Sequence, residues 1–343
     1  MSRQISPDFV PDRQAAATEA QLAPLSRRRF IKNLFAVTAS AVLLKGIDRG
    51  SGDILWQRDR TEIGYTYRPG FYRDSRSIWL VAGGYNVFDT RPIAGALTPS
   101  LSKTAPVGYI NYAENGLSTN ELGQSILDFA NRHKINELNL YLHSMAGTIF
   151  VDTYTKIRHE LALRNVAINN LLLDCSPYNV FDVKNDKRQA AELMARLGNW
   201  WQDPGVISKF SIEAINKVSE RLSRQTAFTA WQMLREAGRN ATSGASPRTS
   251  QDELELLSTL PVYDNLFARV GQVCFIGPSN PQDDQTVDRD LAIAHWRKIT
   301  GGNLQVILLD DIHHADPTRF ASKYNQAISY YLWRQSNRPR GMN

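Results

Sequence analysis

Hydrophobic residues in this chain follow two patterns: short continuous or alternating runs, and longer stretches with a spacing of three or four. The runs predict strands, and the spaced stretches predict amphipathic helices. Strands are expected at Asp53–Arg60, Glu62–Tyr67, Ser77–Ala82, Val107–Tyr112, Leu138–Leu142, Val166–Leu173, Gln272–Gly277 and Leu304–Leu309. Helices are expected at Asn120–Lys134, from Met145 to about Tyr154, at Leu291–Ile299 and at Phe320–Arg334. Strands and helices that alternate over short connections predict an α/β fold with a mostly parallel central sheet.

This alternation stops between Tyr178 and about Pro261, where helical spacing of apolar residues replaces the strand pattern. The stretch predicts a helical insertion in which Gly238–Ser250 forms a polar loop. Four aromatic residues of the insertion either line an apolar pocket or pack inside it: Trp200, Trp201, Phe210 and Trp231. The predicted organisation is a core in two parts, residues 51–178 and 262–343, with the helical insertion at residues 179–261 between them.

Much of the net positive charge lies at the amino terminus. Met1–Gly50 holds 8 Lys and Arg against 4 Asp and Glu, and the rest of the chain holds 32 against 30. A nearly balanced body argues against a nucleic-acid partner. Cys175 and Cys274 are too few for a disulfide framework or a cysteine-based metal site. They are expected to be buried free thiols, with a bridge between them as the alternative.

The basic segment Ser26–Lys32 reads Ser-Arg-Arg-Arg-Phe-Ile-Lys and resembles the twin-arginine export motif. The apolar stretch Asn33–Leu44 follows it and is too short to span a bilayer comfortably, as is typical of a signal sequence. The resemblance implies that residues 1–50 are a leader, that the twin-arginine export machinery is a partner, and that the protein is periplasmic or extracellular. An uncleaved leader would remain as an amino-terminal membrane tether. The alternative is a basic amphipathic helix on a protein or membrane surface.

Ser144 lies where a predicted strand turns directly into a predicted helix. A serine on such a tight turn is exposed above the edge of the sheet, and the N–H of Met145 after it points to where an oxyanion would form. The carboxyl ends of parallel strands are also where ligands bind in open α/β sheets. The alternative is a serine that only caps the helix.

The segment Leu142–Gly147, which reads Leu-His-Ser-Met-Ala-Gly, resembles the nucleophile elbow of α/β-hydrolases, commonly Gly-His-Ser-Met-Gly-Gly. It departs from that pattern at Leu142 and Ala146. Leu142 is the larger change, because it puts a bulky side chain where strand and helix of the elbow approach each other. The resemblance implies an α/β-hydrolase fold, in which the helical insertion at residues 179–261 is the cap.

The same resemblance implies partners for Ser144. In the loop after Gln272–Gly277, the Asp-x-x-Val spacing selects Asp284 as the acid, with Asp283 as its substitute. Asp174 is a further alternative acid, because some hydrolases draw the acid from that strand. In the loop after Leu304–Leu309, the spacing to Pro317 selects His314 as the base, with His313 as its substitute. The resemblance also implies backbone N–H donors to an oxyanion from Met145 and Gly84, with Tyr85 next to Gly84.

These residues together imply an exported serine hydrolase that cleaves an ester, thioester or amide bond through an acyl-enzyme. The substrate would be a small or lipid-like molecule, and no metal or organic cofactor is implied. A catalytically inactive hydrolase-like binding protein is the main alternative, because Leu142 could distort the elbow. A third interpretation keeps the pocket and changes the chemistry, as in family members that are lyases or haloperoxidases.

Overall fold

The computed structural model describes residues 58–67, 70, 74–185, 188 and 244–337 of the 343-residue chain. The predicted leader at residues 1–50, with its twin-arginine motif, lies outside the described residues, as do the four aromatic residues and most of the predicted cap. No helix in the described ranges is both long and apolar enough to cross a membrane. Cys175 and Cys274 are free, buried thiols, as predicted.

A seven-stranded sheet with the order β1-β3-β2-β4-β5-β6-β7 forms the centre of the described core. Its strands are β1 (Glu62–Tyr67), β2 (Ser77–Ala82), β3 (Val107–Asn111), β4 (Glu137–His143), β5 (Ala167–Asp174), β6 (Gln272–Pro278) and β7 (Leu304–Leu309). Only β1 runs antiparallel to its neighbour, β3, and the other pairings are parallel. The prediction of a mostly parallel α/β sheet is therefore confirmed.

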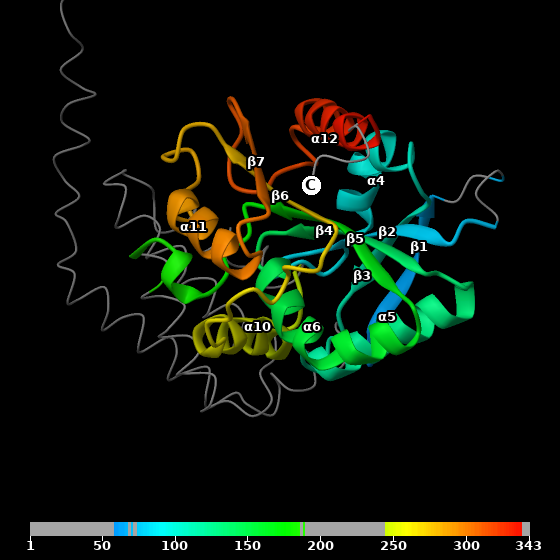
Figure 1. Cartoon of the computed structure of the whole chain (residues 1–343). Helices are drawn as coiled ribbons and strands as arrows, with labels where there is room; N and C mark the ends of the chain where they lie inside the picture. Colours follow the sequence, from blue (N-terminus) through cyan, green and yellow to red (C-terminus); the bar gives the residue numbers. More distant parts are fainter. Residues whose placement is uncertain (1–57, 68–69, 71–73, 186–187, 189–243, 338–343) are drawn as a thin grey trace, which may run out of the picture. The chain divides into compact units, whose positions relative to one another are not determined.

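Helices cover both faces of this sheet (Figure 1). Two pack on one face: α4 (Arg91–Leu101) and α12 (Ala321–Ser336). Three pack on the other: α5 (Thr119–His133), α6 (Ala146–Leu163) and α11 (Arg289–Ile299). A further helix, α10 (Pro247–Thr259), packs against α6, and a short 3₁₀ turn, η2 (Val180–Asp182), follows β5.

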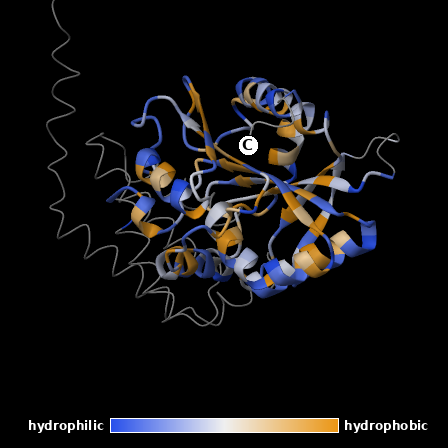
Figure 2. Cartoon of the chain, viewed as in Figure 1, coloured by the Kyte–Doolittle hydropathy of each residue, from blue (hydrophilic) through white to orange (hydrophobic). Residues whose placement is uncertain are grey.

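Alternation of side chains along each strand produces two apolar layers, as the period of two requires. Trp79, Tyr141 and Leu172 face α4 and α12, whereas Leu80, Leu140 and Leu171 face the opposite layer. Apolar residues are concentrated along the central strands, and the helices carry apolar and polar stripes (Figure 2). The buried Trp79 and Trp296 indoles each donate a hydrogen bond, to Thr104 and to the Ser176 carbonyl, so neither N–H is left unsatisfied.

The structure corrects the sequence-based prediction at three places. Residues 58–60, the end of the first predicted strand, are not in a strand, and residues 53–57 lie outside the described ranges. Helix α4 was not predicted, because Pro92, Gly95 and Pro99 mask its pattern, although proline is tolerated in the first turn of a helix. The predicted loop Gly238–Ser250 ends early, because Ser246 caps α10 by accepting the Thr249 N–H at 3.0 Å.

Candidate active site

Ser144 lies at the sharp turn between β4 and α6. Its φ angle of 51° is in the left-handed region, which is unfavourable for a residue with a side chain. The turn is fixed by hydrogen bonds from the Ser144 N–H to the Asp174 carbonyl at 2.8 Å and from the Gly147 N–H to the Ser144 carbonyl at 3.3 Å. Strained backbone at a residue with a hydroxyl side chain is the geometry expected of a nucleophile elbow.

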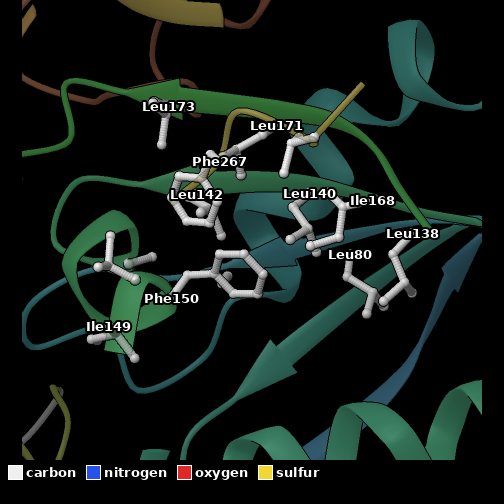
Figure 3. Close-up of a cluster of buried hydrophobic side chains, with 14 of the residues drawn as sticks. Leu80, Leu138, Leu140, Leu142, Ile149, Phe150, Ile168, Leu171, Leu173 and Phe267 are labelled. Carbon is white, nitrogen blue, oxygen red and sulfur yellow. The ribbon is translucent and has the colours of Figure 1, made fainter. Parts of the chain in front are cut away.

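Leu142 fits the elbow because its side chain lies in the apolar core. It is 1% exposed and belongs to the same cluster as Ile149 and Phe150 of α6 (Figure 3). A close contact of the elbow helix occurs at Gly147, where a Cβ would lie 2.8 Å from the Cβ of Ser176 in the loop after β5. The expected crowding at Leu142 is not observed, because its side chain packs among apolar side chains of the core.

The structure brings Ser144, His314 and Asp284 into one hydrogen-bonded row. Ser144 Oγ lies 2.8 Å from His314 Nε2, and His314 Nδ1 lies 2.9 Å and 3.0 Å from the two carboxylate oxygens of Asp284. Because Nδ1–H donates to the carboxylate, Nε2 is left as an acceptor for the serine hydroxyl. This is the arrangement by which an imidazole activates a serine.

Asp284 is buried but is stabilised as a carboxylate. Burial alone would raise its pKa, but the adjacent His314 and the N–H groups of Val287 and Thr286 hold that pKa below its ordinary value. The two N–H groups donate to Oδ1 at 2.8 Å and 2.9 Å. A carboxylate that is ionised in this position can orient the imidazole and stabilise its protonated form.

The two neighbouring substitutes are directed elsewhere. The Asp283 carboxylate accepts a hydrogen bond from the side-chain amide of Asn280 at 3.2 Å. The His313 side chain is exposed, and its ring packs edge-on against Phe320 with centroids 5.7 Å apart. The structure thus places Asp284 and His314, not their neighbours, beside Ser144.

Asp174 is buried near the same site with different partners. The hydroxyl groups of Tyr141 and Tyr324 donate to its two oxygens at 2.6 Å and 2.8 Å. Burial raises the pKa of Asp174 to about 6, although these hydrogen bonds and the charge of His314 act in the opposite direction. Sequence reasoning could not identify the two tyrosines, because they lie 33 and 150 residues away in the chain.

His143 connects the elbow to the histidine loop. Its Nε2 lies 2.6 Å from the Ala315 carbonyl oxygen, so Nε2 carries the proton and donates. Burial lowers the pKa of His143 to about 4, which keeps the ring neutral. His143, which precedes Ser144, is therefore hydrogen-bonded to Ala315, which follows His314. It does not contact the Ser144 hydroxyl as a base.

Gly84 lies directly against the elbow. A Cβ at this position would be 2.8 Å from Ser144 Cβ and 2.9 Å from the Met145 nitrogen, so only glycine fits. Within the described part of the chain, no other residue accepts a hydrogen bond from the N–H of Gly84 or of Met145. Both predicted oxyanion donors are therefore adjacent to Ser144.

Cys175, Asp284 and His314 place three potential metal-ligand atoms within 4.8 Å of one another. However, Asp284 and His314 already bond to each other, and burial raises the pKa of the Cys175 thiol well above its ordinary value. A metal-binding cysteine has to be a thiolate. The donor set therefore suits a hydrogen-bonded acid and base better than a metal ion.

The acid loop is also held by Lys184, which sequence reasoning missed. Its Nζ donates to the backbone carbonyl oxygens of Pro281, at 3.1 Å, and of Asp284. Its backbone N–H donates to the Thr286 carbonyl oxygen at 2.9 Å. Nothing in the local sequence marks this lysine, because its contacts are about 100 residues away.

Solved structures with a similar fold include esterases. A carboxylesterase from Nitrososphaera gargenis matches with a TM-score of 0.52 and 11% identity, over 80% of this chain and 95% of that one. A thermophilic esterase from Thermogutta terrifontis matches with a TM-score of 0.52 and 15% identity, over 80% and 93% of the two chains. No protein-family model and no curated protein sequence matches the chain. The structural likeness and the sheet order establish the α/β-hydrolase fold.

Proposed function

We propose that the protein is a serine hydrolase that cleaves an ester, thioester or amide bond through an acyl-enzyme intermediate. The observation that supports this most directly is the row of hydrogen bonds from Ser144 Oγ through His314 to Asp284, with separations of 2.8 Å and 2.9 Å. Fold alone does not assign activity. The strained elbow, the base in reach and the ionised acid together meet the geometric requirements for an activated serine.

In the proposed mechanism, Ser144 Oγ attacks the substrate carbonyl while His314 Nε2 accepts the hydroxyl proton. The Asp284 carboxylate keeps the proton on Nδ1 and stabilises the imidazolium. The N–H groups of Met145 and Gly84 stabilise the negative oxygen of the tetrahedral intermediate. His314 then protonates the leaving group and afterwards takes a proton from the water that hydrolyses the acyl-enzyme. Apart from the substrate and the water, each group in this scheme belongs to the chain.

Labelling with a fluorophosphonate probe tests the proposal, because such probes react with activated serines. We expect the wild-type protein to be labelled, Ser144→Ala to be unlabelled and His314→Ala to be strongly reduced. Ser322→Ala at the exposed start of α12 and His313→Ala are the matched controls, and both should label like the wild type. A folded wild-type protein that does not label, tested together with small esters as substrates, would contradict the proposal.

The alternative of an inactive binding protein depended on a distorted elbow. The packing of Leu142 in the core gives no sign of such a distortion. The distance of 2.8 Å between Ser144 Oγ and His314 Nε2 favours an enzyme over a binding protein. The same distance is compatible with lyase or haloperoxidase chemistry. Accumulation of an acyl-enzyme at Ser144, measured by mass spectrometry with 4-nitrophenyl acetate, supports the hydrolase.

We further propose that the twin-arginine route exports the protein to the periplasm or the extracellular side. The motif at Ser26–Lys32 carries this proposal. Replacing both Arg27 and Arg28 by lysine should retain the protein in the cytoplasm, because the motif requires the arginine pair. Arg29→Lys, at the variable position, is the control and should be exported. Fractionation of cells with an antibody to the protein provides the measurement, and export of the double variant would exclude this route.

A further inference from the structure

The loop Gly83–Val87, which carries the proposed oxyanion donor Gly84, is held by hydrogen bonds on several sides. The buried Tyr112 hydroxyl donates to the Gly83 carbonyl at 2.9 Å, and the Val87 N–H donates to the Gly84 carbonyl at 3.2 Å. Asn86, two residues after Gly84, has a φ angle of 61°, in the left-handed region. A bend of this kind persists only when its surroundings fix it.

Glu253 provides one such contact from a distant part of the chain. Its Oε2 accepts the Asn86 N–H at 3.1 Å, although the two residues are 167 positions apart. Glu253 lies on α10 and is fully buried. A buried carboxylate is costly unless it is hydrogen-bonded, and a bond from a backbone N–H to a carboxylate is stronger than one between neutral groups.

The segment before α10 holds the same residue on its other side. The Ala245 N–H donates to the Asn86 carbonyl at 3.4 Å. Gly244 packs so closely on the Asn86 amide that a Cβ there would lie 2.1 Å from Asn86 Oδ1. Both the N–H and the carbonyl of Asn86 are thus held by residues 244–253.

We propose that Glu253 is a positioning residue for the oxyanion site: by holding the backbone of Asn86, its carboxylate fixes the N–H groups of Gly84 and Tyr85 relative to Ser144. The inference rests on the proposed function. It follows from the close packing of Gly84 on the elbow, where a displacement of the loop would move these N–H groups away from the reacting carbonyl. A misplacement of about 1 Å lowers rates by about a hundredfold.

Glu253→Ala and Glu253→Gln test this inference with 4-nitrophenyl acetate as the substrate. Removing the acceptor should lower kcat about 10- to 100-fold while KM changes less than about threefold, because oxyanion stabilisation acts mainly in the transition state. Glu253→Gln should recover most of kcat, since its amide oxygen can accept the Asn86 N–H. Affinity for a trifluoromethyl ketone, which forms a tetrahedral adduct with serine, should fall with kcat/KM.

Asp252→Ala is the matched control on the same helix. Asp252 accepts the Leu117 N–H at 2.7 Å and therefore holds a different loop. It should keep the wild-type kcat even if its melting temperature falls. If Glu253→Ala does not fold, Glu253→Met, of similar volume and without a strong acceptor, provides the same comparison.

A folded variant without the acceptor that keeps wild-type kcat and inhibitor affinity would overturn the inference while leaving the proposed function intact. An equal loss of kcat in Asp252→Ala would also overturn it, because the effect would then belong to α10 as a whole. A wild-type protein that neither labels with fluorophosphonate nor hydrolyses esters would overturn both proposals.

Discussion

Two buried aspartates, Asp174 and Asp284, lie at neighbouring strand ends and differ in their partners. Asp174 ends β5 and accepts hydrogen bonds from two tyrosine hydroxyls. Asp284 follows β6 and accepts from the His314 imidazole and two backbone N–H groups. Both side chains are essentially inaccessible to solvent. The two aspartates are therefore equally buried, and the difference between their pKa values comes from their neighbours.

The partners move the pKa of the two carboxyls in opposite directions. Burial raises the pKa of Asp174 to about 6, and neutral hydroxyl donors do not offset that effect. For Asp284, the charge and hydrogen bond of His314 outweigh burial and lower its pKa. The comparison teaches that, of two equally buried carboxyls, the one that faces a group able to carry positive charge has the lower pKa. It also supports the proposed role of Asp284 as the acid.

The largest expected effect is the loss of activity in Asp284→Asn. Without the carboxylate, the imidazole tautomer is no longer fixed and its protonated form is no longer stabilised. We expect kcat/KM for 4-nitrophenyl acetate to fall about ten-thousand-fold, as it does in serine hydrolases that lose this acid.

Asp283→Asn and Asp174→Asn are the matched controls for this prediction. Asp283 lies next in the chain and bonds to Asn280, so its variant should keep wild-type activity. Asp174→Asn should stay within about tenfold of the wild type, because Asp174 contacts tyrosines and not the imidazole nitrogen. Equal losses of kcat/KM in Asp174→Asn and Asp284→Asn would contradict the conclusion that the two aspartates have different roles.

The second prediction concerns stability and pH at Asp174. The pKa of the Asp174 carboxyl is about 6 in the folded protein, against an ordinary value of 3.8. Such a carboxyl destabilises the fold increasingly as the pH rises from the lower value to the higher one. The cost is absent below about pH 4, grows between the two values, and reaches on the order of 3 kcal/mol above pH 6. Asp174→Asn removes it, so the variant should gain stability over the wild type as the pH rises.

Urea unfolding of both proteins at pH 4 and pH 7.5 provides the measurement. The difference between variant and wild type should grow by on the order of 3 kcal/mol between these pH values. Asp284 has a lowered pKa and contributes stability that is lost as the pH falls. This contribution is the same in both proteins and cancels in the difference. A constant difference would mean that Asp174 is ionised in the folded protein as readily as in the unfolded chain.

The contrast between the two aspartates also marks how far the sequence predicts the site. The strands from Glu62 onward and the elbow at Ser144 depend on local patterns, and these predictions agree with the described residues. The resemblance to α/β-hydrolases selected Asp284 and His314 in the loops after two strands, and both lie in the hydrogen-bonded row with Ser144. The sequence left Asp174 as an alternative acid. Its partners Tyr141 and Tyr324, which distinguish it from Asp284, come from a neighbouring strand and from a helix 150 residues away.

Long-range polar contacts escaped the sequence for the same reason. Glu253 and Lys184 look like ordinary surface charges in their local sequence, yet each contacts a loop of the site more than 90 residues away. Helix α4 was missed for a different reason, since its prolines and glycine conceal the buried Ile93 and Leu97. Local patterns predict elements, whereas the environment of a charge is a property of the folded chain.

The smallest expected effect, Tyr324→Phe, tests whether the hydroxyls matter to Asp174 at all. The change leaves one carboxyl oxygen of Asp174 without its donor in a buried site, which costs about 1–3 kcal/mol. The loss should be larger at pH 7.5 than at pH 4, because the ionised carboxylate needs the donor more than the neutral acid does. Tyr330→Phe on the exposed side of α12 is the control and should change stability by less than about 0.5 kcal/mol. In the Asp174→Asn background, the pH dependence of the Tyr324→Phe effect should disappear, since no charge remains for the hydroxyl to stabilise.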